Sequence, residues 1–341
     1  DSISIVMALT VHQGALALLL LLASPALFAL TPGVTITAPV DGTVVRPGET
    51  VTVRVDVDPS LSPSSVLIGD FSGAGMDLVE DTTPPYETTL TVPRDWAGPI
   101  ELGIDVKTTN DDIVGPSSVF INVVPQEVPA RIEFFGETKI IDTDPVPPQM
   151  RSLTLNAYYA DGIVRNVSHP SLGTTYTSSN PAVATISSEG VLTPVAQGIT
   201  FITASFRGLK AYAEVTVGMP TVVASIPIDH TSEASITGGG FLFDRASGQY
   251  VQQVTLRNTG TVPFSRPLKL VLTGLPSGVK LAKADGVTKV VTPLGSPYAD
   301  ASTFSRDFLP PGESVTLTLR FFNYNNQSIT YTPKLYTGNK L

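Results

Sequence analysis

Strict alternation of apolar and polar residues is the feature that most constrains how this chain can fold. Four runs show it clearly: "VTVRVDVD" (Val51–Asp58), "IELGIDVK" (Ile100–Lys107), "AYAEVTV" (Ala211–Val217) and "VTLTLRF" (Val315–Phe321). Successive side chains of a β-strand point to opposite faces, so each run predicts a strand with one buried and one solvated face. Such strands belong to antiparallel sheets whose apolar faces pack together.

Turn-forming residues separate these strands. The chain holds 28 Gly and 29 Pro without a collagen-like period, and no segment after Val34 sustains a helical period. Short strands divided by turn signals at intervals of roughly ten residues predict an all-β protein built of sandwiches.

Two proline-bearing connectors divide the chain. "VVPQEVPA" (Val123–Ala130) ends one strand-rich stretch and opens the next, and "VGMPTVVAS" (Val217–Ser225) does so again. We therefore expect three β-sandwiches in tandem, at residues 34–125, 126–217 and 222–341.

A short echo links the first and third of these units. "PGETV" (Pro47–Val51) and "PGESV" (Pro311–Val315) each lead directly into a long alternating strand. Pro fixes φ and Gly tolerates the positive φ that follows, so both phrases predict a tight turn before the strand.

The N-terminus has the pattern of an export signal. "ALALLLLLA" (Ala15–Ala23) is an apolar core of signal-peptide length, and small residues at Ala26 and Ala29 offer cleavage sites. We expect a signal peptide over residues 1–29, with Met7 as an alternative start because residue 1 is Asp and no Lys or Arg precedes the core.

A membrane anchor is the alternative interpretation of this segment. The apolar run Gly14–Leu30 is short for a span and is interrupted by Pro25, which favours a removed leader. No second hydrophobic run follows. We therefore expect a secreted, extracellular protein associated with the cell surface, with no membrane span after signal removal.

Composition excludes several classes of function. The net charge is −9 with no basic run, so the chain lacks the electrostatic footprint of a nucleic-acid-binding protein. There is no cysteine, which removes disulfides, iron–sulfur clusters, thiolate zinc sites and cysteine nucleophiles. Histidine occurs only at His12, His169 and His230, which offers little for a metal centre or a general base.

The middle unit resembles the bacterial immunoglobulin-like family called group 2, known from intimin- and invasin-type adhesins. Four blocks carry the likeness in order: "LTLNAYYADG" (Leu153–Gly162), "TSSNPAVATIS" (Thr177–Ser187), "GVLTPVAQGITFITAS" (Gly190–Ser205) and "AYAEVTV". Tyr176 stands where the family usually has tryptophan. The turn pairs Asp161-Gly162, Asn180-Pro181 and Glu189-Gly190 predict chain reversals that fix strand register.

The flanking units resemble other exported bacterial Ig-like domains. In the first unit the phrases are "ITAPVDGTVVRPGETVTV" and "PPYETTLTVP", and in the third they are "VTLRNTG", "GLPSGV" and "LPPGESVTLTLRF". The resemblance implies three tandem immunoglobulin-like antiparallel β-sandwiches after the hydrophobic signal segment, the third (222–341) Ig-like or fibronectin-III-like.

Catalytic motifs are weak in this sequence. "GDFSGAG" (Gly69–Gly75) comes nearest to a serine-hydrolase elbow, but Ser72 lacks Gly two residues before it and no helix is expected after it. "TGGGF" (Thr237–Phe241) lacks the Lys and Ser/Thr of a phosphate loop and predicts a bend. We expect no catalytic residues and no enzyme activity.

Calcium is the one metal with candidate ligands. Asp142 and Asp144 share a predicted loop and supply hard oxygen ligands, and they are the best candidates for an ion at a module junction. The pairs Asp56 with Asp58 and Asp111 with Asp112 are further candidates, and none of these pairs has an EF-hand spacing. Apart from calcium we expect no cofactor.

Aromatic residues offer a carbohydrate-binding alternative. Trp96, the only tryptophan, lies in the predicted turn "PRDWAGP", where it either caps the end of the sandwich or binds a ligand. Adjacent rings at Tyr158-Tyr159 and Phe321-Phe322 must point to opposite strand faces, and we expect the outward ring of each pair to be buried against a neighbouring module.

The sequence therefore predicts a non-enzymatic exported bacterial surface protein that acts as an adhesion, spacer or structural module. Expected partners are a protein or polysaccharide at the cell surface, or further copies of the chain. Two alternatives remain: an accessory region of a secreted enzyme, for instance a carbohydrate-binding one, and a subunit of an extracellular filament joined through edge strands.

Overall fold

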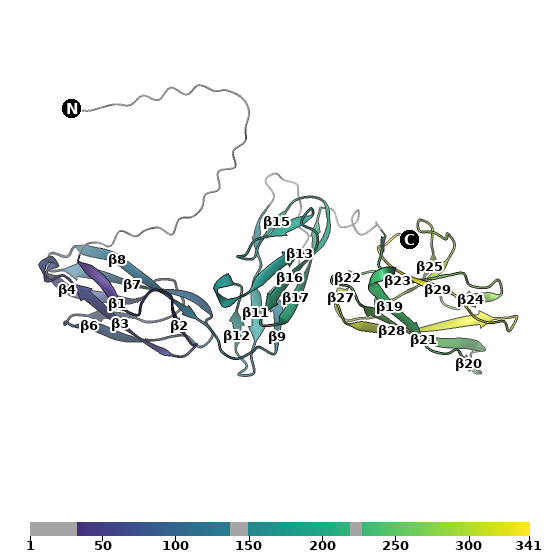
Figure 1. Cartoon of the computed structure of the whole chain (residues 1–341), viewed down its shortest axis with the longest axis horizontal. Coiled ribbons are helices and arrows are strands. Elements are labelled where there is room, and N and C mark those ends of the chain that lie inside the picture. The colour runs from purple at the N-terminus through teal and green to yellow at the C-terminus, as the bar shows by residue number, and fades with distance from the viewer. Residues whose placement is uncertain (1–32, 137–148, 219–226) are drawn as a thin grey trace, which may run out of the picture.

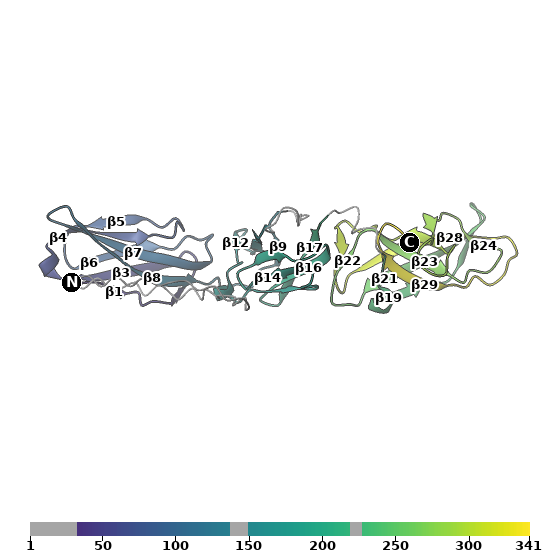
Figure 2. The same cartoon turned by 90° about the horizontal axis from the view of Figure 1, so that it is seen from above.

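The computed structural model of the chain describes residues 33–136, 149–218 and 227–341, so the expected signal peptide lies outside the described residues. Within those residues the secondary structure consists of strands and short 3₁₀ turns, with no α-helix. The strands form three groups, each drawn from one continuous stretch of the chain, which stand in a row along the long axis (Figures 1 and 2). The expected all-β architecture is confirmed.

The first module comprises strands β1 to β8, which form two sheets in the orders β1-β3-β6 and β2-β8-β7-β4-β5. Its elements are β1 (Val34–Ala38), β2 (Thr43–Val45), β3 (Thr50–Val57), η1 (Pro59–Leu61), β4 (Pro63–Asp70), β5 (Leu78–Asp81), β6 (Tyr86–Thr91), β7 (Gly98–Thr108) and β8 (Ile113–Val123). One pair, β2 with β8, is parallel rather than antiparallel. The chain crosses between sheets after β1, so β2 meets β8 while running in the same direction.

The second module comprises strands β9 to β17. Its elements are β9 (Arg131–Phe134), β10 (Arg151–Ser152), β11 (Leu155–Tyr158), β12 (Val164–Asn166), η2 (Pro170–Leu172), β13 (Thr175–Ser178), β14 (Ala184–Ile186), β15 (Val191–Pro194), β16 (Gly198–Phe206) and β17 (Leu209–Val217). The sheets have the orders β12-β11-β9, β13-β16-β17 and β10-β15-β14. In this arrangement β9 and β17 each lie at the edge of a sheet.

The third module comprises strands β18 to β29. Its elements are β18 (Ile228–Asp229), η3 (Thr231–Glu233), β19 (Ala234–Gly238), β20 (Leu242–Asp244), β21 (Gln249–Asn258), β22 (Phe264–Ser265), β23 (Leu268–Thr273), β24 (Val279–Leu281), β25 (Gly286–Val287), β26 (Pro297–Asp300), β27 (Phe308–Leu309), β28 (Ser314–Asn323) and β29 (Thr332–Thr337). Two larger sheets, β18-β29-β23-β26-β25 and β19-β21-β28-β24, enclose the core, and β20 extends the edge of β21.

The alternating runs bury the faces that the sequence predicts. Every apolar member of the four runs is buried: Val51, Val53, Val55 and Val57; Ile100, Leu102, Ile104 and Val106; Ala211, Ala213, Val215 and Val217; Val315, Leu317, Leu319 and Phe321. The first two sets belong to one apolar cluster, the third contributes to the clusters of the second module, and the fourth lies in the core of the third module.

The turns of the second module lie where the sequence predicts them. The Asp161-Gly162 pair joins β11 to β12, and Gly162 has φ +80°. At the second turn, the Val183 N–H donates to the Asn180 carbonyl at 3.0 Å. At the third, Gly190 has φ +75°, a conformation that residues with a Cβ resist. These corners set the register on which the buried faces depend.

The two Pro-Gly phrases form the same turn in the first and third modules. Gly48 and Gly312 both have φ +81°. In each turn the N–H of the following glutamate donates to the carbonyl three residues earlier: Glu49 to Arg46 at 3.1 Å and Glu313 to Pro310 at 3.2 Å. This geometry requires glycine at the third position of the turn.

Replacing either turn glycine by alanine is expected to destabilise its module. Gly48→Ala and Gly312→Ala each force a side chain into the left-handed region, which costs roughly 1–2 kcal/mol. Urea unfolding of each variant measures the loss. The control is Gly240→Ala, because Gly240 has no positive φ and a Cβ there meets nothing within 4 Å. Equal stability of all three variants would show that the turns do not need glycine.

Candidate functional site

The junction between the first and second modules is held by an arginine in a hairpin turn. Arg207 and Gly208 join β16 to β17 with φ values of +48° and +81°. From this corner the Arg207 guanidinium donates to the backbone carbonyls of Gln126 at 2.9 Å and Glu127 at 2.7 Å, and also to that of Pro125. One charged group thus binds three consecutive carbonyls of the connector that joins the modules.

A second arginine binds across the same junction. Arg165 of β12 is 4% exposed, and its Nε donates to the Arg94 carbonyl of the first module at 2.9 Å. The guanidinium also pairs with Asp161 at 2.8 Å and lies over the Tyr159 ring at 4.7 Å from the ring centroid. Because the charge is paired with a carboxylate and stacked on an aromatic ring, it can be buried at the junction.

Polar and apolar contacts complete this junction. The Ser171 hydroxyl donates to the Asn122 side chain of β8 at 3.0 Å, while the Asn122 amide donates to the Ser171 carbonyl at 3.4 Å. Ala97 and Val124 of the first module pack against the apolar cluster of the second. The two modules therefore share hydrogen bonds and apolar surface.

The junction between the second and third modules depends on aromatic contacts. The Phe308 ring of β27 packs edge-to-face against Phe201, with centroids 5.5 Å apart, and against Tyr212, with centroids 6.4 Å apart. Phe201 is buried although its neighbour Ile202 occupies the core on the other face of the same strand. The outer face of this sheet is therefore covered by the third module.

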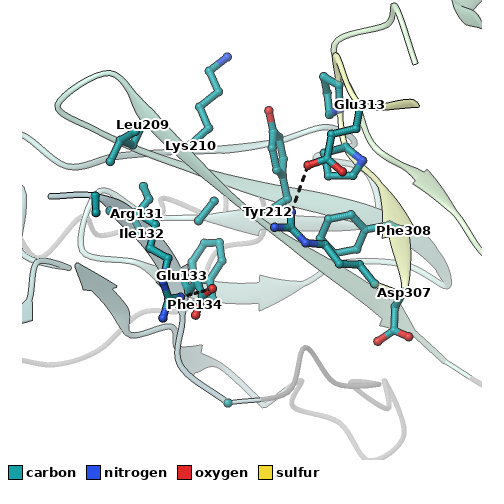
Figure 3. Close-up of a pocket in the computed structure, with 16 residues that line it drawn as sticks. Arg131, Ile132, Glu133, Phe134, Leu209, Lys210, Tyr212, Asp307, Phe308 and Glu313 are labelled. Carbon is teal, nitrogen blue, oxygen red and sulfur yellow. Dashed lines mark hydrogen bonds and ion pairs between the residues drawn. The ribbon is translucent and has the colours of Figure 1, made fainter. Parts of the chain in front are cut away.

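A groove of about 820 Å³ lies along this junction. Figure 3 shows Arg131, Glu133 and Phe134 projecting from β9, while Phe308 and Glu313 project from the third module. Arg131 pairs with Glu133, and Arg306 pairs with Glu313 at 3.4 Å. Paired charges beside aromatic rings suit an extended polar ligand rather than bond-breaking chemistry.

A carboxyl group is enclosed at this same junction. Glu214 points outward from β17, and its Oε2 is shielded from solvent with no hydrogen-bond partner among the described residues. Burial raises the pKa of Glu214, the Ser265 hydroxyl lowers it by hydrogen bonding, and the charge of Asp307 raises it. Burial also raises the pKa of Tyr212.

Trp96 is half-buried against the apolar cluster of the first module. Its indole N–H donates to the Pro99 carbonyl at 3.3 Å. The side chain therefore has a packing role at the end of the sandwich, and a ligand-binding role stays a prediction.

The best calcium candidates, Asp142 and Asp144, lie outside the described residues. Of the other carboxylates, Asp58 accepts the Ser60 N–H at 2.9 Å and Asp111 pairs with Lys107 at 2.9 Å. In the described ranges, no three His, Cys, Asp or Glu side chains gather closely enough to hold a metal ion.

The two weak catalytic motifs begin at the ends of strands β4 and β19 and continue into the loops that follow. Ser72 follows the end of β4, and its hydroxyl donates to Asp70 at 2.6 Å, so it takes part in a local turn. His169 caps η2 in the second module, whereas His230 contacts Glu233 and Thr337 in the third. These groups do not converge on one point.

The outward aromatic rings differ from the prediction. Tyr158 is covered by Arg131 of its own module, with the guanidinium 3.5 Å from the ring centroid. Phe322 stacks on Tyr324, also within its own module. The ring buried against a neighbour is instead Phe201, because its strand begins beside the third module.

Sequence reasoning missed the junction residues Arg207, Arg165 and Glu214. The "RG" pair between two alternating strands is a hairpin signal that places Arg207 at a corner. No comparable signal marks Arg165 or Glu214. The alternation of their strands predicts only that each side chain points outward or contacts its own module.

Similarity to a known family is found in the N-terminal part of the chain. Residues 32–113 match a family model described as a bacterial Ig domain. The match confirms the predicted bacterial Ig-like character of the first module, while the group 2 assignment of residues 126–217 stays a prediction. No curated protein matches the chain.

Three solved structures illustrate what the chain is similar to. The D00-D0 domain of intimin is 11% identical, with 54% of this chain and 99% of that chain covered and a TM-score of 0.24. The Clostridium thermocellum CbhA fibronectin(III)-like modules are 22% identical, with 26% and 93% covered and a TM-score of 0.23. Surface layer protein SbsC, domains 1–6, is 11% identical, with 91% and 53% covered and a TM-score of 0.18. Scores this low decide nothing about function.

Arg207→Ala is expected to loosen the first junction. The substitution removes all three guanidinium hydrogen bonds to the connector, and hydrogen bonds to charged groups are each worth roughly 1.5–3 kcal/mol. The chain has no native cysteine, so cysteines placed at the exposed positions Thr82 and Ser188 can carry spin labels without background. The distance distribution between the labels should broaden in the variant.

The matched control for this measurement is Arg257→Ala, because Arg257 is an exposed arginine of the third module. It should leave the distribution between the first two modules unchanged. A narrow distribution in Arg207→Ala would contradict a stiffening role for this side chain.

The second junction is expected to weaken as pH rises. A carboxyl whose pKa is raised on docking stabilises the docked state in its protonated form. This stabilisation is complete below the ordinary carboxyl pKa of 4.5, and it is lost as the pH rises through the raised pKa. Labels at the exposed positions Ser188 and Ala246 should therefore give a broader distance distribution at neutral pH than at pH 4.5.

Glu214→Gln should remove this pH dependence, because the amide does not ionise. Glu133→Gln alters a groove carboxyl that is exposed, and it should leave the dependence intact. If both variants behave like the unmodified chain, Glu214 is not the controlling group.

Proposed function

We propose that this chain is a non-enzymatic exported bacterial surface protein whose Ig-like modules, at residues 34–125, 126–217 and 222–341, act as a stiff spacer that presents an adhesive surface. The leader over residues 1–29 would direct its export. Its partners would be a protein or polysaccharide at the cell surface.

The observation that carries the proposal is the first junction. Modules joined by a connector move independently unless their interface is substantial. Here Arg207 binds the connector at three carbonyls, and Arg165 is buried between the modules with its charge paired. Such contacts support a fixed angle between neighbours, which is what a spacer needs.

The arrangement of reactive groups supports a non-enzymatic role. Ser72 donates its hydroxyl to Asp70, and the described histidines, His169 and His230, lie in different modules. The groove carries paired charges. Binding fits these observations better than catalysis does.

Localisation on the outside of the cell is part of the proposal. The apolar segment Ala15–Ala23, the bacterial Ig domain match over residues 32–113 and the lack of cysteine fit an exported protein of this kind. No helix in the described part of the chain has the length and apolar character needed to cross a membrane.

Two alternatives from the sequence have distinct signatures. An accessory region of a secreted enzyme would adjoin a catalytic domain in the full gene, and the aromatic groove between the second and third modules favours this idea. A filament subunit would join through edge strands, and the exposed Leu78 on edge strand β5 favours that one.

Small-angle X-ray scattering of the chain without residues 1–29 tests the spacer. We expect an elongated particle whose maximum dimension does not change with protein concentration. A scattering profile typical of a flexible chain of modules would contradict the proposal, and a maximum dimension that grows with concentration would favour the filament.

Labelling and surface proteolysis of intact cells should reach the protein, and protection from both would contradict an external location.

A further inference from the structure

We propose that the loop after β28, residues 323–328, is a binding platform for an uncharged polysaccharide, centred on Tyr324. The inference rests on the adhesive role proposed above and names its surface and ligand class. The loop is separate from the groove between the second and third modules.

The loop lies at the far end of the third module. Strand β28 begins at Ser314, next to Glu313 in the groove, and ends at Asn323. Ten residues in a strand at about 3.3 Å each span roughly 30 Å, so the loop is on the side away from the second module. Strand β24, which pairs with the end of β28, occupies that far end in Figure 1.

Tyr324 forms a flat aromatic surface on this loop. The side chain is 72% exposed, although its ring is stacked on Phe322 with an interplanar angle of 9° and centroids 5.7 Å apart. The two rings are thus nearly parallel and offset, and most of the tyrosine side chain is open to solvent. The apolar C–H face of a pyranose can pack on such a ring, as apolar groups pack on aromatic faces generally.

The loop is held in this shape by its own side chains. The Asn323 amide donates to the Gln327 carbonyl at 2.7 Å and its oxygen accepts the Gln327 N–H at 3.1 Å. The Tyr250 hydroxyl donates to the Asn326 side chain at 2.7 Å. Because the platform is ordered before any ligand arrives, binding loses little conformational entropy.

Amide groups around the ring suit sugar hydroxyls. Asn325 and Asn326 are exposed beside Tyr324, and each side-chain amide offers both donors and an acceptor. Hydroxyl groups, which donate and accept, are the complementary chemistry.

The loop itself carries no charged side chain, while Lys280 of β24 lies across from Phe322. In an acidic chain of net charge −9, residues 321–333 contain no Asp, Glu, Lys or Arg. Nearby, Arg320 is paired with Asp244 at 3.1 Å. An anionic ligand would meet the single cation Lys280 beside the loop, whereas the loop itself offers rings and amides that suit an uncharged ligand.

A second exposed ring lies on the edge strand near the loop. Phe243 of edge strand β20 is 53% exposed and contacts Tyr250, with ring centroids 5.1 Å apart. Tyr250 in turn binds Asn326 of the loop. Phe243 lies on the same side of this sheet as the core residue Phe321 and opposite to Phe322, so the platform is assigned to Tyr324 alone.

Affinity electrophoresis of the chain without residues 1–29 tests the platform. Gels contain a β-glucan, an α-glucan, a mannan or, as the charged comparison, alginate. We expect retardation by at least one uncharged polymer and not by alginate. Tyr324→Ala should weaken binding at least tenfold, while Tyr324→Phe, which keeps the ring, should bind within about threefold of the unmodified chain.

The matched control is Phe135→Ala, because Phe135 is 74% exposed in the second module. The affinity of the Phe135→Ala variant for the polymer should equal that of the unmodified chain. No retardation by any uncharged polymer, retardation by alginate alone, or equal loss in Phe135→Ala and Tyr324→Ala would overturn the proposal. Scattering separates the two proposals: a stiff particle without sugar binding refutes only the platform, and a flexible particle that still binds refutes only the spacer.

Discussion

Each module depends on burying every second side chain of its long strands between two layers. Strand β7 shows the constraint in its strongest form, because Ile100, Leu102, Ile104 and Val106 are all fully shielded from solvent. A shift of one residue would expose this entire set and bury Glu101 and Asp105. The turn residues at Gly48, Gly162 and Gly312 therefore matter chiefly because they hold the strands in register.

The same alternation leaves a second face available for contacts between modules. On β16, Ile202 fills the core of the second module while Phe201 is covered by Phe308 of the third. On β17, Ala213 points inward and Glu214 meets the neighbouring module. Side chains on the outer sheet faces beside the junctions are thus covered by the neighbouring module, whereas they would be exposed in an isolated module. Because Ser265 and Asp307 of the third module act on the Glu214 carboxyl, we expect its charge to affect the contact between the two modules.

The two junctions differ in the physical basis of their contacts. The first uses the guanidinium groups of Arg207 and Arg165, which bind backbone carbonyls and do not change charge at ordinary pH. The second uses aromatic packing around Phe308 and a buried carboxyl whose pKa is raised. The first joint is therefore expected to respond less to pH near neutrality than the second. The platform on Tyr324 lies beyond the second joint, at the far end of the third module.

Local patterns determined the fold class of this protein, because alternation and turn chemistry depend only on neighbouring residues. The buried faces of the four runs and the Pro-Gly, Asp-Gly and Asn-Pro turns follow from them. The tertiary structure alone decided the positions of Arg165, Glu214 and Tyr324, whose environments come from strands or modules distant in sequence. The alternation predicts that such a side chain points outward, but it does not predict which residues the side chain contacts there. The outward face becomes a junction or a free surface only when neighbouring modules are placed beside it.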